Sequence, residues 1–548
     1  MLFRPFLAGI ILTAGAFAQL TSFPKPNYFR ETFNTTKTKV ELKDPVKLKD
    51  YVHNGKLELS LKDYLALVMA NNTDIQLQNL TLEAPKNAIQ RAFGVWDPVA
   101  QASFTSTRST SPSTNVLDGA AEIKQLSQPL NMSVTQLLPA GTNYTVSWGG
   151  SKTTTNSSFN NYNPALSSNL QVSFSQPLLR NRGTYVNKLS VMIARSRLRV
   201  SEYGLRNTMI NLISAAENAY WDVVSARESL KVAEGARNVS AEFLKLSQKQ
   251  LDLGALSPLD IYNPQQSLAQ NEVAVAQARF RVTQFEDALR KQIGVDLDPD
   301  IRNLPIELTD TAEMPTDSIK LDREQGVQTA LQNRPDLKQA TQSLDSDDLS
   351  IQSAKNALLP NLALTGNYLT NGRGGTYIQR TNVFNQGVSS SVITVLPGGL
   401  GDALGQMFGF GFGSYQFGLR LTLPIRSRAA SADLADAIVR KKQDALTVRS
   451  TQQTIRLDVL NAITNVESSK ESVNLAKVAR DYAQKALDAE NKKYELGTEL
   501  QQNVLLAANA LATSESTLVT NQIALRRNLL NLLMKLGTLL DERGIVVQ

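Results

Sequence analysis

The sequence has no cysteine and a single histidine, His53, among its 548 residues. Without cysteine the chain has no disulfide, no thiol nucleophile, no thiolate metal site and no acceptor thiol for a bacterial lipid anchor. His53 lies in the N-terminal region, where a solvated loop residue is the ordinary interpretation. The acidic residues stand among Lys and Arg at surface spacing, as in 226–231, which is typical of solubilising pairs. The sequence therefore predicts no enzyme, no cofactor and no metal site.

A strong excess of one charge is also missing, and so are long apolar runs beyond the N-terminus. The 57 basic and 50 acidic residues are spread along the chain, which indicates a solvated surface and no nucleic-acid partner. Residues 1–18 contain Arg4, an apolar run and a small-x-small site ending at Ala18, which predicts a signal peptide cleaved there. An N-terminal membrane anchor is the alternative, but the run is shorter than the roughly 20 residues of a spanning helix.

One plan occurs twice in the sequence. The stretch ANNTDIQLQ (70–78) matches QNRPDLKQA (332–340), and NLQVSFSQPLL (169–179) matches YQFGLRLTLPI (415–425). Four later pairs share an offset of 243 residues: Asn218 with Asn461, Gly254 with Gly497, Leu268 with Leu511, and Gly294 with Gly537. A register kept without gaps over this distance indicates an internal two-fold repeat whose helices cannot slip.

Each repeat, 58–295 and 324–540, is expected to contain a helix, a β segment and a pair of long helices. The expected ranges are about 60–93 and 324–358 for the first helices, 98–177 and 360–424 for the β segments, and 185–293 and 428–538 for the helix pairs. Prolines mark a connector at 296–323. Residues 19–57 are interpreted as an irregular lead-in, and 541–548 as a C-terminal tail.

The long helices carry a heptad stripe in which large and small residues alternate. In the second repeat the stripe comprises Ile455, Val459, Ala462, Val466, Ser469, Val473, Ala476, Arg480, Ala483, Leu487, Glu490 and Tyr494. The same positions less 243 form a similar stripe in the first repeat. Because small side chains let helices approach closely, the stripe predicts antiparallel coiled coils. A helix from about 428 to 496 would be on the order of 100 Å long.

The stretch GSYQFGLRLTLPI (413–425) alternates apolar and polar residues and ends at a proline, as a two-faced strand does. The other repeat has an in-phase counterpart, and 130–138 and 142–150 also alternate. The connecting segments are rich in Ser, Thr, Asn and Gly, which suits loops outside a cell. The apolar positions of the two matching strands are predicted to face lipid: Leu170, Val172, Phe174, Tyr415, Phe417, Leu419 and Leu421. A soluble coiled-coil protein with a small β domain is the alternative.

Lipid admits strands only in closed barrels, because an open edge leaves backbone groups without partners. Two hairpins in one chain cannot close a barrel, so the strands of several protomers are expected to share one. The fold class is therefore α+β, a membrane protein with long helical coiled coils and a transmembrane β-barrel shared between protomers.

The ordered set of motifs resembles the TolC family of outer-membrane efflux channels. The motifs are LSLKDYLALVMANNTDIQLQ (59–78), GVQTALQNRPDLKQA (326–340), SFSQPLLRNRG (173–183), LTLPI (421–425), and the tip turns LDLGALSPLDIYNPQQSL (251–268) and YELGTELQQNVLLAANAL (494–511). The resemblance implies a homotrimer with a 12-stranded barrel, four strands from each protomer, on a trimeric α-barrel that crosses the periplasm.

The resemblance also implies a passive exit duct of a tripartite efflux or type I secretion system, located in the outer membrane and surrounded by its lipid. Its implied partners are a periplasmic adaptor (membrane fusion protein) and an inner-membrane transporter, and its cargo is small molecules or proteins. The competing hypothesis is a periplasmic coiled-coil scaffold or adaptor without a barrel. The lipoyl-like β modules of an adaptor are not evident in the sequence.

Two segments depart from this pattern. The first β region, 98–177, is longer than the second, so it holds either an extra extracellular hairpin or more than four strands per protomer. The glycine-rich stretch 398–413 has a GxG pattern, but phosphate binding is disfavoured because no helix is expected after it. Phe408, Phe410 and Phe412 in this stretch are interpreted as an interfacial aromatic belt or a hydrophobic loop.

The family resemblance places the periplasmic entrance at the helix tips, whose turns are expected at Gly254, Gly497, Ser257 and Thr498. Asp260 and Tyr494 match a hydrogen-bonded pair of the closed state. A local interpretation is favoured for Asp260, with Ser257 as N-cap, Pro258 as first helical residue and Asp260 as the acid of a capping box. Tyr494 also fits the heptad seam.

Two further entrance features of the family are not matched here. Leu259 and Glu499 stand where the family has a second, basic contact. Asn503 and Leu506 stand where it often has rings of carboxylates. Since an amide binds cations less strongly than a carboxylate, weak cation block is predicted.

Overall fold

The structure is a computed structural model that describes residues 48–114, 118–254, 257–311, 322–380, 392–496 and 498–546. All of these belong to one compact unit, Val46–Gln548. The expected signal peptide, residues 19–47 of the expected lead-in, and Gly497 lie outside the described residues. None of the described helices combines the length and the apolar character that crossing a membrane would take.

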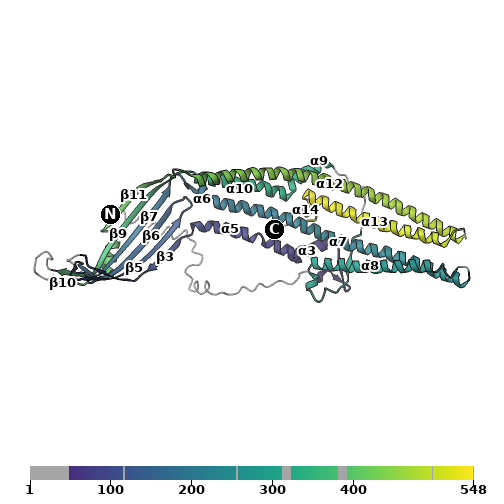
Figure 1. Cartoon of the computed structure of the whole chain (residues 1–548), viewed down its shortest axis with the longest axis horizontal. Helices are drawn as coiled ribbons and strands as arrows, with labels where there is room; N and C mark the ends of the chain where they lie inside the picture. The colour runs from purple at the N-terminus through teal and green to yellow at the C-terminus, as the bar shows by residue number, and fades with distance from the viewer. Residues whose placement is uncertain are drawn as a thin grey trace. The chain divides into compact units, whose positions relative to one another are not determined.

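A large antiparallel sheet forms one end of this unit (Figure 1). Its eight described strands are β3 (Val99–Phe104), β4 (Thr107–Pro112), β5 (Glu122–Leu137), β6 (Asn143–Thr155), β7 (Tyr162–Pro177), β9 (Asn361–Arg380), β10 (Val392–Leu396) and β11 (Gly413–Thr422). β3 and β4 pair with successive parts of β5, and β11 and β10 with successive parts of β9. The sheet is therefore six strands wide, in the order β3/β4, β5, β6, β7, β9 and β10/β11.

The extra pair of strands in the first repeat is β5 and β6. They pair continuously from Leu137↔Asn143 to Gln125↔Thr155, and the Gln136 amide donates to the carbonyl of Trp96, 2.8 Å away, just after the last helix before the sheet. The hairpin turn thus lies at the helical end of the sheet, so the extra pair is not an extracellular hairpin. The four strands per protomer implied by the family resemblance are too few for this chain.

The helix expected over 60–93 is wrong as a single element. It is divided into α3 (Leu61–Asn71), α4 (Thr73–Leu80) and α5 (Glu83–Phe93), followed by the short η2 (Gly94–Trp96). Asn72 causes the first break, because its side-chain oxygen accepts hydrogen bonds from the backbone N–H groups of Asp74 and Ile75. Its amide also donates to the carbonyl of Gln292, 3.0 Å away, which ties the break to a distant helix end.

The helix expected over 324–358 is likewise two elements, α9 (Arg323–Asn333) and α10 (Pro335–Ala357). Pro335 disfavours helical backbone at Arg334, where the helix breaks. Gly537 fits against this break with a φ of +76°, and a Cβ there would lie 3.0 Å from the backbone nitrogen of Arg334. Arg334 and Lys535 both pair with Asp458, and they outweigh the effect of burial and hold the pKa of Asp458 below its ordinary value.

Four long helices make up most of the helical part of the unit (Figure 1). They are α7 (Leu189–Asp252), α8 (Tyr262–Gln292), α12 (Arg428–Glu495) and α13 (Gln501–Leu536), and the short α6 (Thr184–Asn187) precedes α7. α7 packs on α8 and α13, and α12 packs on α13 and α10. In α12 the seam residues Ile455, Val459, Ala462, Val466, Val473 and Ala476 are buried, which confirms that part of the predicted stripe.

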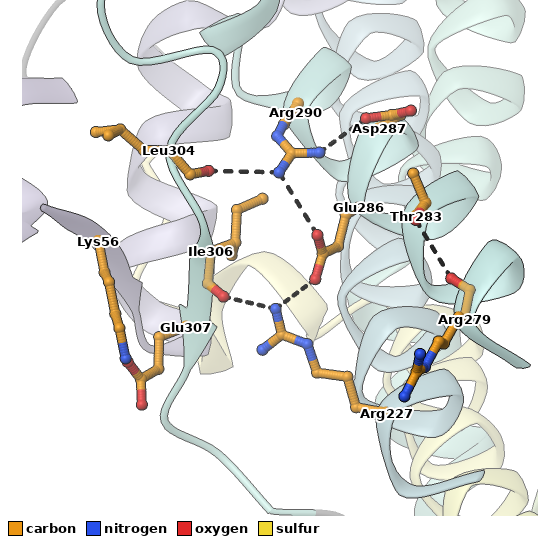
Figure 2. A network of polar contacts seen from close by, with 10 residues as sticks. All are labelled: Lys56, Arg227, Arg279, Thr283, Glu286, Asp287, Arg290, Leu304, Ile306 and Glu307. Atoms are coloured by element: carbon orange, nitrogen blue, oxygen red, sulfur yellow. Dashed lines mark hydrogen bonds and ion pairs between the residues drawn. The ribbon is translucent and has the colours of Figure 1, made fainter. Parts of the chain in front are cut away.

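The last residues of the expected lead-in are not irregular. They form η1 (Leu48–Tyr51), β1 (Val52–His53) and β2 (Lys56–Leu59), and β2 pairs in parallel with β8 (Ile306–Leu308) of the connector, which η4 (Val295–Leu297) precedes. Figure 2 shows how this small sheet is held against the helices. Arg227 of α7 donates to the Ile306 carbonyl and to Glu286 of α8, both at 2.6 Å, and Glu286 also accepts from Arg290.

The expected C-terminal tail is anchored as well. α14 (Leu539–Glu542) packs on α7, and Arg543 binds the buried carboxylate of Glu217 through two hydrogen bonds of 2.5 and 2.9 Å. A last correction concerns 398–413, where no helix was expected next to the GxG pattern. Residues Leu400–Phe408 form α11, which packs on β7 and β9.

Candidate functional site: helix tips and membrane face

The turn between α7 and α8 differs from the expected one in its second half. Gly254 lies directly after α7 with a φ of +72°, a conformation that favours glycine at a turn. The capping-box interpretation is wrong, because α8 begins at Tyr262 and Asp260 lies before it. Ser257 instead stabilises a local turn, accepting the N–H of Leu259 on its hydroxyl and the N–H of Asp260 on its carbonyl.

Tyr494 links the two helix tips of one chain, but its partner is not Asp260. Its hydroxyl accepts a hydrogen bond of 2.7 Å from the amide of Gln250, on the last turn of α7. The Asp260–Tyr494 pair that the family resemblance implies is not formed within this chain. Gln250 is a residue that sequence reasoning missed, although it lies on the last turn before the tip glycine.

The second tip, between α12 and α13, is held by polar contacts around Glu499. Thr498 closes the end of α12, because its N–H and its hydroxyl both donate to the Lys493 carbonyl at 3.0 Å. The Glu499 carboxylate accepts from the amide of Asn503 and from the Leu500 N–H. The bond from Asn503 has the largest effect on the Glu499 carboxylate, and the bond from Leu500 the next. Together with the nearby Lys493 they hold the pKa of Glu499 below its ordinary value. Glu499 is thus an anion at neutral pH.

Lys493 joins this cluster through a 2.6 Å ion pair with Glu490 of the preceding turn. Asn503 and Leu506 are both exposed on the first turns of α13, one turn apart, while Val504 between them is buried. The predicted entrance residues Tyr494, Glu499 and Asn503 therefore surround one tip, whereas Asp260 and Leu259 lie at the other. Lys493 and Glu490 are additional members of this cluster.

One face of the large sheet is apolar across all six strands. A single row of paired residues runs Ala100, Val134, Val146, Val172, Tyr368 and Tyr415. The rows beside it on the same face include Met132, Trp148, Leu170, Phe174 and Phe417. On β11, Tyr415, Phe417, Leu419 and Leu421 are 61–78% exposed. The seven predicted lipid-facing residues thus share one continuous face, on which the Phe174 and Phe417 rings lie 6.4 Å apart.

The opposite face of the sheet is polar. The alternate rows pair Thr135 with Thr145 and Ser147 with Gln171, and the side chains of Gln171 and Asn367 hydrogen-bond at 2.9 Å. Arg420 of β11 lies on this face. Apolar residues outside and polar residues inside are the arrangement of a barrel wall around water.

Among the described residues, no group of three or more His, Asp or Glu gathers in a way that could hold a metal ion. His53 lies exposed in β1.

The comparisons with known proteins agree with this geometry. The family model described as "Outer membrane efflux protein" matches residues 115–295 and 326–538, more than half of the chain. The chain is 22% identical over 344 residues to the "Probable efflux pump outer membrane protein TtgC" of Pseudomonas putida, and 24% identical over 344 residues to "Outer membrane protein TolC" of Salmonella enteritidis. These matches cover 62% and 60% of this chain and 62% of each relative.

A solved structure, a membrane protein from Pseudomonas aeruginosa, has the same fold with a TM-score of 0.62 at 17% identity. The match covers 91% of this chain and 97% of that one. Like these relatives, the chain is an outer-membrane protein. It belongs to the outer membrane efflux protein family, the family of TolC.

Proposed function

We propose that three copies of this chain form a passive exit duct, whose barrel lies in the outer membrane and whose helices cross the periplasm. The observation that carries the proposal is that the large sheet has an unpaired strand on each side. The helix layer also has an uncovered helix on each of the same two sides. Such a chain is one sector of a ring.

The sheet edges are β3/β4 on one side and β10/β11 on the other. Every residue of β3 and β4 and nearly every residue of β11 is exposed, because each strand has a neighbour on one side only. In lipid, the unpaired backbone groups of these edges would cost several kcal/mol each. Pairing β3/β4 of one copy with β10/β11 of the next satisfies both edges.

The helices end on the same two sides. α5, which leads into β3, packs on α7, as does α8, while α12, which follows β11, packs on α13 and α10. α8 and α12 therefore lie at opposite ends of the helix layer. Both expose large apolar side chains: Val273 and Phe280 on α8, and Leu446, Leu475 and Tyr482 on α12. Packing α8 and α5 of one copy against α12 of the next would cover them and make a trimeric α-barrel of antiparallel coiled coils.

Six strands from each of three chains give a barrel of 18 strands, where four from each would give 12. Since barrel diameter grows with strand number, this duct has a wider outer-membrane pore than a 12-stranded relative. The two-fold repeat of the sequence supplies each chain with two tips, so the ring has six tips at its periplasmic entrance.

The duct itself does no chemistry, and its cargo is small molecules or proteins delivered from the periplasm or from an inner-membrane pump. Relatives are named as outer-membrane components of efflux pumps. By analogy, a periplasmic adaptor joins the helix tips of this chain to an inner-membrane transporter, in a tripartite efflux or type I secretion system.

Two measurements on the full chain test the duct. Membranes of expressing cells are washed with carbonate, and the detergent-purified protein is then added to a planar lipid bilayer. We expect the chain to stay with the washed membranes and to give stable single-channel currents. Release by carbonate together with an absence of currents would contradict the proposal and favour a periplasmic scaffold.

A further inference from the structure

α11 is fixed to the large sheet by its buried side and by specific hydrogen bonds. Ala403 and Met407 are fully buried against β7 and β9. The hydroxyl of Thr370 donates to the Met407 carbonyl at 3.0 Å. The hydroxyl of Ser168, which accepts from the Trp148 indole at 2.9 Å, lies 3.2 Å from the Met407 sulfur. The helix is therefore packed firmly against strands β7 and β9 of the large sheet.

Two residues of β9 beneath α11, Gly372 and Gly374, have no side chain. A Cβ on Gly372 would lie 1.8 Å from the carbonyl oxygen of Ala403, and one on Gly374 would lie 2.2 Å from that of Gly399. No side chain fits at either position without moving the helix. Glycine in a strand interior costs stability, so these two glycines indicate that close approach of α11 is required.

Alternation along the strands shows which face α11 covers. Ser168 is in phase with Leu170 and Val172 on β7, and Thr370 is in phase with Tyr368 on β9. α11 thus lies on the apolar face, whereas the polar face carries Gln171 and Asn367. In a barrel with its polar face inside, α11 is outside the wall and is not a plug.

The exposed surface of α11 and of the residues after it is mostly apolar, and its exposed amide, Gln406, accepts the N–H of Arg373 at 3.1 Å. Leu400, Phe408, Phe410 and Phe412 are exposed, and Asp402 is the single charged residue of 398–413. The Asp402 carboxylate accepts the N–H of Gly399 at 2.7 Å, in the first turn of the helix. The Phe410 ring lies 6.3 Å from that of Tyr368, so this surface continues the apolar face of the sheet.

The apolar face of the strands alone is short for a membrane. On β9 it extends from Leu362 to Tyr368 and ends at Thr370, where α11 begins to cover the strand. Seven residues at about 3.3 Å each, tilted by about 40°, span roughly 18 Å, against the roughly 25 Å apolar band of an outer-membrane barrel. A helix about 10 Å across, laid over the next residues, supplies the difference.

We propose that α11 and the phenylalanines at 408, 410 and 412 are embedded in the lipid leaflet farther from the periplasmic helices, and that they complete the apolar band of the barrel. The partner of this surface is the lipid bilayer itself. This inference rests on the proposed barrel, because it takes the apolar face as the outer one. At this depth the strands carry glycine and other small residues and are covered by α11. The aromatic residues that contact the lipid therefore belong to the helix and to the residues after it.

The absence of cysteine gives a direct test, since one introduced cysteine carries one nitroxide label. Phe408→Cys, Phe417→Cys and Gln416→Cys are labelled in the full chain and reconstituted into phosphatidylethanolamine–phosphatidylglycerol vesicles. Electron paramagnetic resonance then compares collision of each label with oxygen, which enriches in lipid, and with a water-soluble nickel chelate. Phe417 reports the apolar face of β11, and Gln416 beside it reports the polar face.

We expect the labels at Phe408 and Phe417 to collide preferentially with oxygen, and the label at Gln416 with the nickel chelate. Adding Gly372→Val, which displaces α11, should shift the label at Phe408 toward the chelate and leave Phe417 unchanged. A label at Phe408 that behaves like Gln416 while Phe417 reports lipid would overturn the inference. Chelate contact at both Phe408 and Phe417 would instead contradict the membrane barrel.

Discussion

At the scale of single residues, Asp347 shows how burial makes the helix layer sensitive to pH. It lies in α10, 5% exposed, beside Asp444 of α12. Burial first, and then Asp444, raise its pKa from 3.8 to about 6, although Arg440 opposes the shift. The folded chain therefore holds a proton on Asp347 at a pH where the unfolded chain has lost it. Folding is stabilised as the pH falls from about 6 toward 4, and this contribution is lost as the pH rises through 6.

Replacing Asp347 removes this dependence. We expect Asp347→Asn to raise the stability at pH 7.5 by about 1–3 kcal/mol, since a pKa shift of about two units corresponds to roughly 3 kcal/mol at most. It should also flatten the dependence of the thermal midpoint on pH between 4 and 6, followed by circular dichroism in detergent. Asp345→Asn, at an exposed position of the same helix that does not contribute to the Asp347 shift, is the control and should do neither. An unchanged slope in Asp347→Asn would show that another group is responsible.

Asn503 sets the expected response of the entrance to cations. In the wild type its uncharged amide donates a hydrogen bond to the Glu499 carboxylate, which keeps its negative charge. In Asn503→Asp the donor is lost and a second carboxylate stands one turn from the first, in each copy of the proposed trimer. We expect divalent cations to block single-channel currents at concentrations roughly tenfold lower, about 1.4 kcal/mol tighter. Asn503→Ser, which removes the amide without adding charge, is the control. Wild-type block already as strong as that of the variant would contradict the assignment.

Residue roles were predictable where they depend on backbone conformation and not where they depend on a distant partner. Gly254 was identified correctly, because a positive φ is a local requirement. Ser257 and Asp260 fit a capping pattern that also fits a free turn, and the choice depends on where α8 begins. Tyr494 was placed at the tip correctly, but Gln250, 244 positions away in the sequence, could not be identified as its partner.

At the scale of elements, the two faces of β11 differ in what they tolerate. We expect Leu419→Arg to lower stability by about 2–4 kcal/mol, the cost of a charge facing the middle of a bilayer. Gln416→Arg, on the polar face, should leave stability unchanged and shift ion selectivity toward anions. Urea unfolding in lipid vesicles and reversal potentials measure the two effects. Equal destabilisation by both variants would mean that both faces of the strand meet the same environment.

Strong periodicity made the long helices and the alternating strands predictable, whereas short elements held by tertiary contacts were missed. α12 follows the predicted range closely because its stripe is long. α11 was not expected, because nine residues with glycine at 401 and 405 have weak helix propensity, and packing on β9 overrides it. The break at Asn72 combines a local cap of Asp74 and Ile75 with a bond to the distant Gln292, and no local pattern contains that second contact.

At the scale of the whole molecule, the large sheet of one chain has an unpaired strand at each edge. Alternation and repetition predicted a helical protein with membrane-facing strands, and the family resemblance predicted its location in the outer membrane. The number of strands did not, because a β segment of given length can form loops or strands, and pairing partners decide between them. β5 and β6 are each paired on both sides, so they belong to the wall.

Closure of the wall by neighbouring copies is tested most directly by disulfide cross-linking between the two sheet edges. β3 and β11 are separated in one chain by β5, β6, β7 and β9, so a disulfide between them must join two chains. Gln101→Cys is combined in turn with Gln416→Cys, Gly418→Cys and Arg420→Cys in the cysteine-free chain, and oxidised membranes are run on denaturing gels. Neighbouring strands bring Cα atoms to about 4.5–5.5 Å, within disulfide range. We expect at least one pairing to give a covalent trimer that reduction returns to monomer; monomers alone in every pairing, or a ladder beyond three chains, would contradict the shared barrel.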